Sequence, residues 1–213
     1  MDRLIKGYRE FRKREWPRQR ANYERLAKAG QKPEYLVIAC SDSRSDPATV
    51  FNTRPGEIFT VRNIAAAVPP YEDENTIRGT SAAIAYAVLA LGVRNIVVMG
   101  HAQCGGVAAA IDKNLAHGVP FVTPWVALLN PAVEKTASIA DSHARHVATE
   151  RECVKLSLER LMAFPFVAER VKAGTLQLDG ARFGIADGKL ELLDQKTGTF
   201  MPVERRRAFM RWF

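Results

Sequence analysis

Two stretches of sequence decide the fold: residues 35–44 read YLVIACSDSR, and residues 95–106 read NIVVMGHAQCGG. Each begins with a short apolar run, which is typical of a strand buried on both faces of a sheet. Residues 58–62 predict another strand after the Pro55-Gly56 turn, and the Ala-rich residues 80–91 predict a helix between this strand and the next. A helix that crosses between strands in this way joins parallel neighbours. We therefore predict an α/β fold with a mostly parallel central β-sheet flanked by helices.

The second half of the chain continues this alternation. Residues 131–172 show helical spacing, and the turn signals Asp179-Gly180 and Asp187-Gly188 predict short strands within residues 176–193. The sequence contains no internal repeat, low-complexity tract or Gly/Ser-rich linker. We therefore expect a single domain overall, with an amino-terminal helical arm over residues 1–30 and an α/β domain over residues 31–213.

Length and composition set the class of protein. The chain has 213 residues, of which 47% are hydrophobic, and this is enough to bury one substantial core. No apolar run approaches the roughly 18 residues that a membrane span requires. The amino terminus mixes acidic and basic residues and has neither the apolar core nor the cleavage site of a secretory signal. We expect a cytoplasmic protein that does not bind membranes.

Most of the positive charge lies in the arm. The formal net charge is +8, and residues 1–30 alone hold ten Lys and Arg against four Asp and Glu. Apolar residues at near-helical spacing interleave with these charges: Leu4, Ile5, Tyr8, Phe11 and Trp16. We therefore expect the arm to pack its apolar face on the body or on a partner subunit, and we expect no binding to nucleic acid.

The two strand-end loops carry residues that bind metals. Three cysteines are too few for a disulfide framework, and reduced thiols are better suited to metal or thiol chemistry. Cys40 follows the first strand, while His101 and Cys104 follow the third, and the carboxyl ends of parallel strands meet at one edge of the sheet. Two thiolates and an imidazole suit zinc. Because a structural zinc site usually has four protein ligands, a set of three predicts a catalytic site open to water or substrate.

The other histidines and cysteines do not lie in a loop that directly follows a predicted strand. They are His117, His143, His146 and Cys153. The spacing of His143 and His146 on a predicted helix allows a separate metal site, although such pairs are more often exposed surface residues. We expect Cys153 to be a small buried side chain.

Taken together, these motifs resemble those of the β-carbonic anhydrases. The matching segments are CSDSR at residues 40–44, VRNI at residues 61–64, GTSAAI at residues 79–84 and GHAQCGG at residues 100–106. The resemblance covers about residues 30–190. It implies a carbonate dehydratase, a zinc-dependent lyase with one Zn²⁺ per subunit, that reversibly hydrates carbon dioxide to bicarbonate and a proton.

The resemblance also implies roles for individual residues. Asp42 and Arg44 are expected to form a buried pair, in which Arg44 holds the carboxylate so that Asp42 accepts a hydrogen bond from the attacking water. Without Arg44, Asp42 would be free to bind the zinc, as it does in the closed state of some members of the family. The alternative is an ordinary ion pair that stabilises the loop.

The predicted substrate-binding residues are Gly105, Val68, Tyr71, Phe51 and Tyr86. The backbone N–H of Gly105 is expected to hold a bicarbonate oxygen, because a glycine at a helix start permits close approach. The other four are expected to line an apolar niche, although each is equally compatible with the ordinary core.

The sequence departs from family patterns at two places. Val37 and Phe183 stand where members regulated by bicarbonate carry tryptophan and tyrosine, so bicarbonate-driven closure is not expected. Arg54 stands where plant-like members place a glutamine that reaches substrate in the neighbouring subunit, which leaves the identity of that contact open.

Two other functions compete with carbon dioxide hydration. Relatives on the same scaffold hydrolyse carbon disulfide or carbonyl sulfide with the same ligands and the same Asp/Arg pair. A non-enzymatic zinc-stabilised binding module, with the basic arm as its functional element, is the second alternative. For the enzyme, the resemblance implies a homodimer or a dimer-based oligomer in which the arm embraces the neighbouring subunit.

Overall fold

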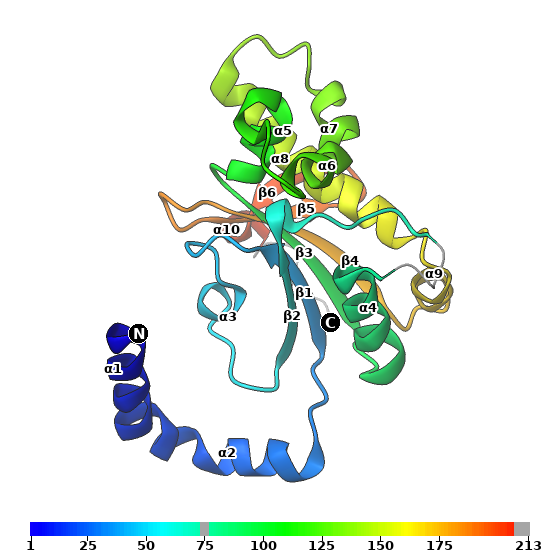
Figure 1. Ribbon diagram of the computed structural model, residues 1–213. Helices are drawn as coiled ribbons and strands as arrows, with labels where there is room; N and C mark the ends of the chain where they lie inside the picture. Colours follow the sequence, from blue (N-terminus) through cyan, green and yellow to red (C-terminus); the bar gives the residue numbers. More distant parts are fainter. Residues whose placement is uncertain (73–76, 207–213) are drawn as a thin grey trace.

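The computed structural model describes residues 1–72 and 77–206 as a helical arm followed by an α/β body (Figure 1). Within these residues, six strands form one sheet in the order β2-β1-β3-β4-β5-β6. Strands β2, β1, β3 and β4 are parallel to one another. Strand β5 pairs antiparallel with β4, and β6 pairs antiparallel with β5. The strands are β1 (Tyr35–Cys40), β2 (Ile58–Asn63), β3 (Asn95–His101), β4 (Gln177–Phe183), β5 (Leu190–Asp194) and β6 (Thr199–Pro202). The predicted fold class is confirmed.

The central strands are apolar throughout because both faces of the sheet are covered. Leu36 and Ile38 of β1 pack on one face against helices, while Val37 and Ala39 belong to a separate apolar cluster on the other face. The first face is covered by α4 (Gly79–Ala85), its continuation η3 (Tyr86–Ala90), α8 (Ser142–Leu161) and α9 (Pro165–Lys172). Burial on both sides accounts for the unbroken apolar runs.

A second group of helices gathers over the carboxyl ends of β1 and β3. It contains α5 (Gly105–Ile111), α6 (Val122–Val126), α7 (Asn130–Lys135) and the amino-terminal part of α8, seen at the top of Figure 1. Their apolar side chains pack in one cluster with Cys40 and Cys104. The remaining short helices are α3 (Pro47–Val50), η2 (Ile64–Ala66), η4 (Lys113–Ala116), η5 (Ala127–Leu129) and α10 (Val203–Arg206). This end of the sheet is therefore shielded from solvent by protein.

One of the two predicted turns near the carboxyl terminus is wrong. Strand β4 runs straight through Asp179-Gly180, and Gly180 packs under α8. A Cβ on Gly180 would lie 3.0 Å from Val154 Cγ1 and 3.1 Å from Leu158 Cδ1. The glycine is there to let helix and strand approach closely, not to turn the chain. The second turn is confirmed, because Gly188, with φ of +66°, lies between the antiparallel strands β4 and β5.

The amino-terminal arm is helical as predicted. It consists of α1 (Asp2–Glu10), η1 (Phe11–Glu15) and α2 (Trp16–Ala29), and none of its residues is buried. The arm extends away from the body in Figure 1. Its carboxyl end is attached to the turn before β2, where Asn22 Nδ2 donates to the Pro55 carbonyl at 3.0 Å and Leu26 lies over Gly56. In residues 1–72 and 77–206, no segment therefore covers the apolar face of α1.

In the described part of the chain, no helix combines the length and the apolar character required to span a bilayer.

Candidate metal centre

The structure brings the three predicted ligands together. Cys40 is the last residue of β1, His101 is the last residue of β3, and Cys104 precedes α5 as its N-cap. Their ligand atoms all lie within 4.8 Å of one another, and all three residues are buried. Among the described residues, no other group of three such side chains is close enough to hold a metal ion. Strands β1 and β3 are parallel neighbours, which places the two loops at the same edge of the sheet.

The geometry of this cluster suits zinc. Two sulfurs bound to one tetrahedral Zn²⁺ lie about 3.8 Å apart, since each Zn–S bond is about 2.3 Å. The Sγ atoms of Cys40 and Cys104 are 4.0 Å apart. His101 Nδ1 lies 2.9 Å from the Ala102 carbonyl, to which it can donate, and its buried Nε2 has no hydrogen-bond partner. An imidazole nitrogen left without a partner beside two thiols is the atom that a metal ion would satisfy.

The two thiols are coupled. A hydrogen bond from Cys104 lowers the pKa of Cys40, and His101 and the Ala65 backbone act in the same direction. The pKa of Cys104 is raised in turn, first by its bond to Cys40 and then by burial. Burial alone would lower the pKa of His101, but the Cys40 sulfur and the Ala102 carbonyl raise it overall. Cys40 is therefore the cysteine that loses its proton more easily. A bound cation would also displace the proton of Cys104.

A strained turn lies behind Cys40. Ala65 and Ala66 have φ of +63° and +53°, in the left-handed region that costs a non-glycine residue about 1–3 kcal/mol. Asn63 holds this turn by exchanging two hydrogen bonds of 2.9 Å with the backbone of Ala67. Gly106 packs against the turn, since a Cβ there would lie 2.6 Å from Ile64 Cγ2. The VRNI and GHAQCGG motifs therefore pack directly against each other.

Asp42 and Arg44 form the predicted pair. Arg44 donates from Nε to Asp42 Oδ1 at 2.9 Å, from Nη2 to Oδ2 at 2.7 Å, and from its backbone N to Oδ1 at 2.9 Å. The side chain of Asp42 is 18% exposed and that of Arg44 is 48% exposed, so the expectation of a buried pair holds only for the carboxylate. Arg44 Nη2 also donates to the Gln103 carbonyl at 3.4 Å, so the exposed guanidinium lies over the loop of the second cysteine. The Arg44 side chain holds the pKa of Asp42 well below its usual range.

Arg62 fixes the same loop, a role that the sequence did not reveal. It donates from Nε to the Cys40 carbonyl at 3.0 Å and from Nη2 to the Asp42 carbonyl at 2.7 Å. Its Nη1 pairs with Asp46 at 2.9 Å. Arg62 belongs to the VRNI motif, which the sequence analysis singled out. Its contacts are to backbone carbonyls of residues 40–42, and only the pairing of β1 with β2 brings these within its reach.

Of the predicted substrate-binding residues, Gly105 is adjacent to the cluster and Val68 is not. Gly105 directly follows Cys104 at the start of α5, and a Cβ on it would meet nothing within 4 Å. Val68 is fully buried and follows the strained turn, but its side chain packs in the core beneath α4 and α8.

The other three lie in different surroundings. Tyr71 packs edge-on against Phe164, with ring centroids 5.2 Å apart. Phe51 packs against the sheet face that contains Val37 and Phe183. Tyr86 is 53% exposed and packs beside Phe59. Phe59 pairs with Leu36 in β1, four residues before Cys40, so Tyr86 lies near the opposite end of the strands. The structure therefore does not bring Tyr86 to the cluster of its own chain.

The alternative histidine site is not formed. His146 Nε2 lies 3.0 Å from Glu150 Oε1, but His143 and His146 belong to no group of potential ligands in the part of the chain that the structure describes. Cys153 is 3% exposed, as expected of a small core side chain, and burial raises its pKa to about 12. Arg54 is exposed, and its backbone N bonds to Glu57.

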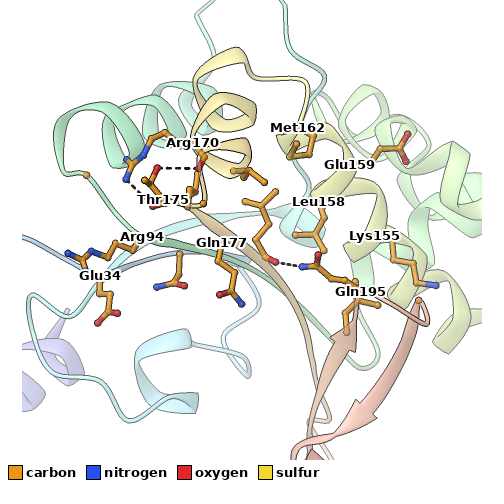
Figure 2. Close-up of a pocket in the computed structure, with 18 residues that line it drawn as sticks. Glu34, Arg94, Lys155, Leu158, Glu159, Met162, Arg170, Thr175, Gln177 and Gln195 are labelled. Atoms are coloured by element: carbon orange, nitrogen blue, oxygen red, sulfur yellow. Dashed lines mark hydrogen bonds between the residues drawn. The ribbon is translucent and has the colours of Figure 1, made fainter. Parts of the chain in front are cut away.

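A large cavity lies at the opposite end of the sheet. Its volume is about 1370 Å³, and its lining includes Asn95 and Gln177, the first residues of β3 and β4. Figure 2 shows Arg94, Arg170 and Gln177 on one side of it and Lys155 and Gln195 on the other. None of the predicted site residues lines this cavity. The cavity is therefore separate from the cluster of Cys40, His101 and Cys104.

Comparison with known proteins gives a consistent result. Residues 35–190 match the sequence profile of the carbonic anhydrase family. The chain is 38% identical over 194 residues to beta carbonic anhydrase 5, chloroplastic, of Arabidopsis thaliana, which covers 89% of this chain and 64% of that protein. It is 36% identical over 205 residues to beta carbonic anhydrase 3 of the same plant, covering 92% of this chain and 79% of that protein. The chain thus spans a little under two thirds of the first relative.

Solved structures show the same similarity. The β-carbonic anhydrase CcaA superposes with a TM-score of 0.88 at 30% identity, covering 95% of this chain and 98% of that chain. A tetrameric β-carbonic anhydrase from Sordaria macrospora superposes with a TM-score of 0.80, also at 30% identity, covering 94% of this chain and 98% of that chain. At these coverages the similarity includes the body and at least part of the arm.

Proposed function

Because this chain belongs to the β-carbonic anhydrase family, we propose that it hydrates carbon dioxide reversibly to bicarbonate and a proton, with one zinc ion held by Cys40, His101 and Cys104. The observation that carries this proposal is the unpartnered, buried Nε2 of His101 beside two sulfurs 4.0 Å apart. When bound there, zinc supplies a Lewis acid that lowers the pKa of water and so provides a nucleophile for carbon dioxide.

Asp42 is placed to orient the attacking water. Its Oδ2 lies 3.9 Å from His101 Nε2, so the carboxylate borders the space between the three ligands. Because its pKa is low, Asp42 is ionised at neutral pH and acts as a hydrogen-bond acceptor, not as an acid. Arg44 holds both carboxylate oxygens and prevents Asp42 from turning further toward the ligands.

Replacing Arg44 by Leu is expected to lower kcat/KM for carbon dioxide hydration by roughly 10–100-fold, as is typical when a residue that orients a metal-site group is lost. The freed carboxylate would turn toward the metal ligands and occupy the position that water needs. Stopped-flow hydration assays, with zinc content measured on the same samples, test this expectation. Arg94→Leu, at the far end of the sheet, is the matched control. Equal activity in the two variants would reduce the Asp42–Arg44 pair to a loop-stabilising contact.

Purified protein decides between the competing functions. Zinc content should be measured first, and initial rates should then be compared for carbon dioxide, carbon disulfide and carbonyl sulfide under the same conditions. Preferential turnover of carbon dioxide supports the proposal, and faster turnover of either sulfur compound would reassign the enzyme. A zinc-stabilised binding module would turn over none of them, and its binding to a polyanion would weaken steeply with salt.

We further propose that two subunits complete the substrate pocket. Tyr86 lies far along the sheet from the cluster of its own chain and is half exposed, so it can contribute only to a neighbour's pocket. On α1, Leu4 is 71% exposed and Tyr8 is 61% exposed, and helical spacing places them on one face. Apolar side chains held off the body on a helix indicate docking on a second copy of the chain. The relative from Sordaria macrospora is tetrameric, which agrees with a dimer-based assembly.

The double variant Leu4→Ala, Tyr8→Ala is expected to raise the dimer dissociation constant by at least ~100-fold. Each apolar side chain of this size contributes about 1.5–3 kcal/mol when fully buried, and a symmetric dimer loses each contact twice. Light scattering over a dilution series measures the change. The control is Lys6→Ala, Lys13→Ala, which removes charges from the opposite face of the arm. An unchanged dimer would show that the apolar face of α1 is not part of the interface.

A further inference from the structure

A buried carboxylate lies directly behind the metal centre. Glu150 projects from α8 and is 2% exposed. Its Oε1 accepts a hydrogen bond of 3.2 Å from the backbone N of Cys104. Cys104 is both a candidate zinc ligand and the N-cap of α5, so this bond fixes the backbone from which the sulfur projects.

Glu150 is itself held rigidly. Arg182 of β4, 8% exposed, donates to Glu150 Oε2 from Nε at 2.8 Å, and its Nη2 lies 2.7 Å from the same oxygen. Arg182 also pairs with Glu191 of β5 at 3.3 Å, and Glu191 pairs with Arg151 at 2.7 Å. His146 Nε2 lies 3.0 Å from Glu150 Oε1. A chain of alternating charges thus connects the Cys104 loop to the antiparallel edge of the sheet.

Stability alone does not account for a pair so deeply buried. Removing two charges from water costs several kcal/mol per ion, and apolar replacements of similar volume are often neutral or stabilising. What an apolar pair would lack is an acceptor for the Cys104 N–H. That N–H would then be buried without a partner.

The same helix also fastens the loop behind the other sulfur. Ser157, two turns along α8 from Glu150, accepts a hydrogen bond of 3.2 Å from the Val68 backbone N and donates to the Ala66 carbonyl at 3.3 Å. Ala66 belongs to the strained turn that backs Cys40. One face of α8 therefore holds both the backbone of Cys104 and the turn that packs behind Cys40.

From these contacts we infer that Glu150 is a positioning residue of the metal centre: it fixes Cys104 through the backbone N–H, and Arg182 fixes Glu150. This inference rests on the proposed zinc site. The role belongs to the acceptor oxygen of residue 150, and the charge of Arg182 serves to orient that oxygen.

Two double variants separate this role from stability: Glu150→Gln with Arg182→Met, and Glu150→Met with Arg182→Met. Neither leaves a buried charge unpaired, and Gln and Met have similar shapes, but only Gln retains an oxygen that can accept from Cys104 N. We expect the Met/Met variant to bind zinc roughly 10–100-fold more weakly than the Gln/Met variant. The dissociation constants are measured by competition with a chelator. Absorption spectra of the Co²⁺-substituted proteins report whether the tetrahedral geometry is distorted.

Glu152 provides the control on the same helix. Glu152 pairs with Lys135 and Lys155 and not with the backbone of Cys104. The variants Glu152→Gln and Glu152→Met should therefore bind zinc equally. If wild-type protein bound no zinc, the proposed function would fail, and the role of Glu150 with it. If wild-type protein bound zinc, and the two double variants bound it with equal affinity and identical Co²⁺ spectra, only the positioning role would be overturned.

Discussion

Replacing Asp42 by Asn should lower kcat/KM for carbon dioxide hydration by roughly 100–1000-fold while zinc remains bound. Asn has the same size, but it carries no charge, and its N–H₂ group cannot accept the hydrogen bond that Arg44 Nη2 donates to Asp42 Oδ2. The water-orienting acceptor that borders the three ligands is therefore lost. Because Asp42 is outside the group formed by Cys40, His101 and Cys104, the metal should stay in place. Stopped-flow rates and zinc analysis on the same preparation measure both effects.

Asp46 provides a matched control in the same loop. It pairs with Arg62 and caps α3 through a 3.0 Å bond from Thr49 N. Asn is an equally good N-cap, so Asp46→Asn should retain most of the activity. If Asp42→Asn were as active as Asp46→Asn, Asp42 would be assigned to loop stability and the orienting role withdrawn.

The pH dependence gives an independent check on Asp42. Its pKa is depressed in the folded protein, so the Arg44 pair stabilises the fold fully above the unfolded pKa of about 3.9 and is lost as pH falls through the folded pKa. The stability difference between wild type and Asp42→Asn should therefore shrink in acid. Between pH 6 and 9 Asp42 remains ionised, so any inflection in the rate there comes from another group.

Replacing Cys104 by Ser should have the second large effect: zinc affinity falls by more than the ~100-fold typical of losing an outer contact, and turnover falls with it. Serine fits the space of the thiol but is a poor ligand for zinc, which prefers thiolate and imidazole. Zinc content after dialysis measures the loss. A second readout is the melting temperature, which should rise with added zinc in the wild type and not in the variant.

Cys153→Ser is the control for the Cys104 variant. Cys153 is equally buried but lies outside the ligand cluster, so its replacement should lower the melting temperature without removing zinc. Full zinc occupancy in Cys104→Ser would exclude Cys104 as a ligand and would overturn the proposed site.

Much of this molecule was predictable from local pattern. The strands at residues 35–40 and 95–101 begin as short apolar runs, and runs of this kind signal a strand in the middle of a covered sheet. The strand at residues 58–63 was also expected, but it lies at the edge of the sheet and buries only Val61. The convergence of Cys40 with His101 and Cys104 also followed from sequence, because parallel neighbouring strands end at the same edge. The strands and the convergence of the three residues could be inferred because they need only a few adjacent residues and the rule that parallel strands end at the same edge of a sheet.

Other features depend on contacts between distant segments and left no local signal. Asp179-Gly180 has the composition of a turn, yet it lies in β4 because α8 needs the space that a side chain at Gly180 would fill. Glu150 and Arg182 are two ordinary charges among many in the sequence, and only the packing of α8 on β4 makes them a buried pair behind Cys104. Tyr86 was expected in the pocket from the family resemblance, but it packs beside Phe59, near the start of β2, and not at the ends of β1 and β3. Sequence alone thus determined the first three strands, the helical arm and the convergence of Cys40, His101 and Cys104, since each follows from residue type and spacing. The tertiary structure decided which side chains support those three residues, because that depends on which surfaces meet after the chain has folded.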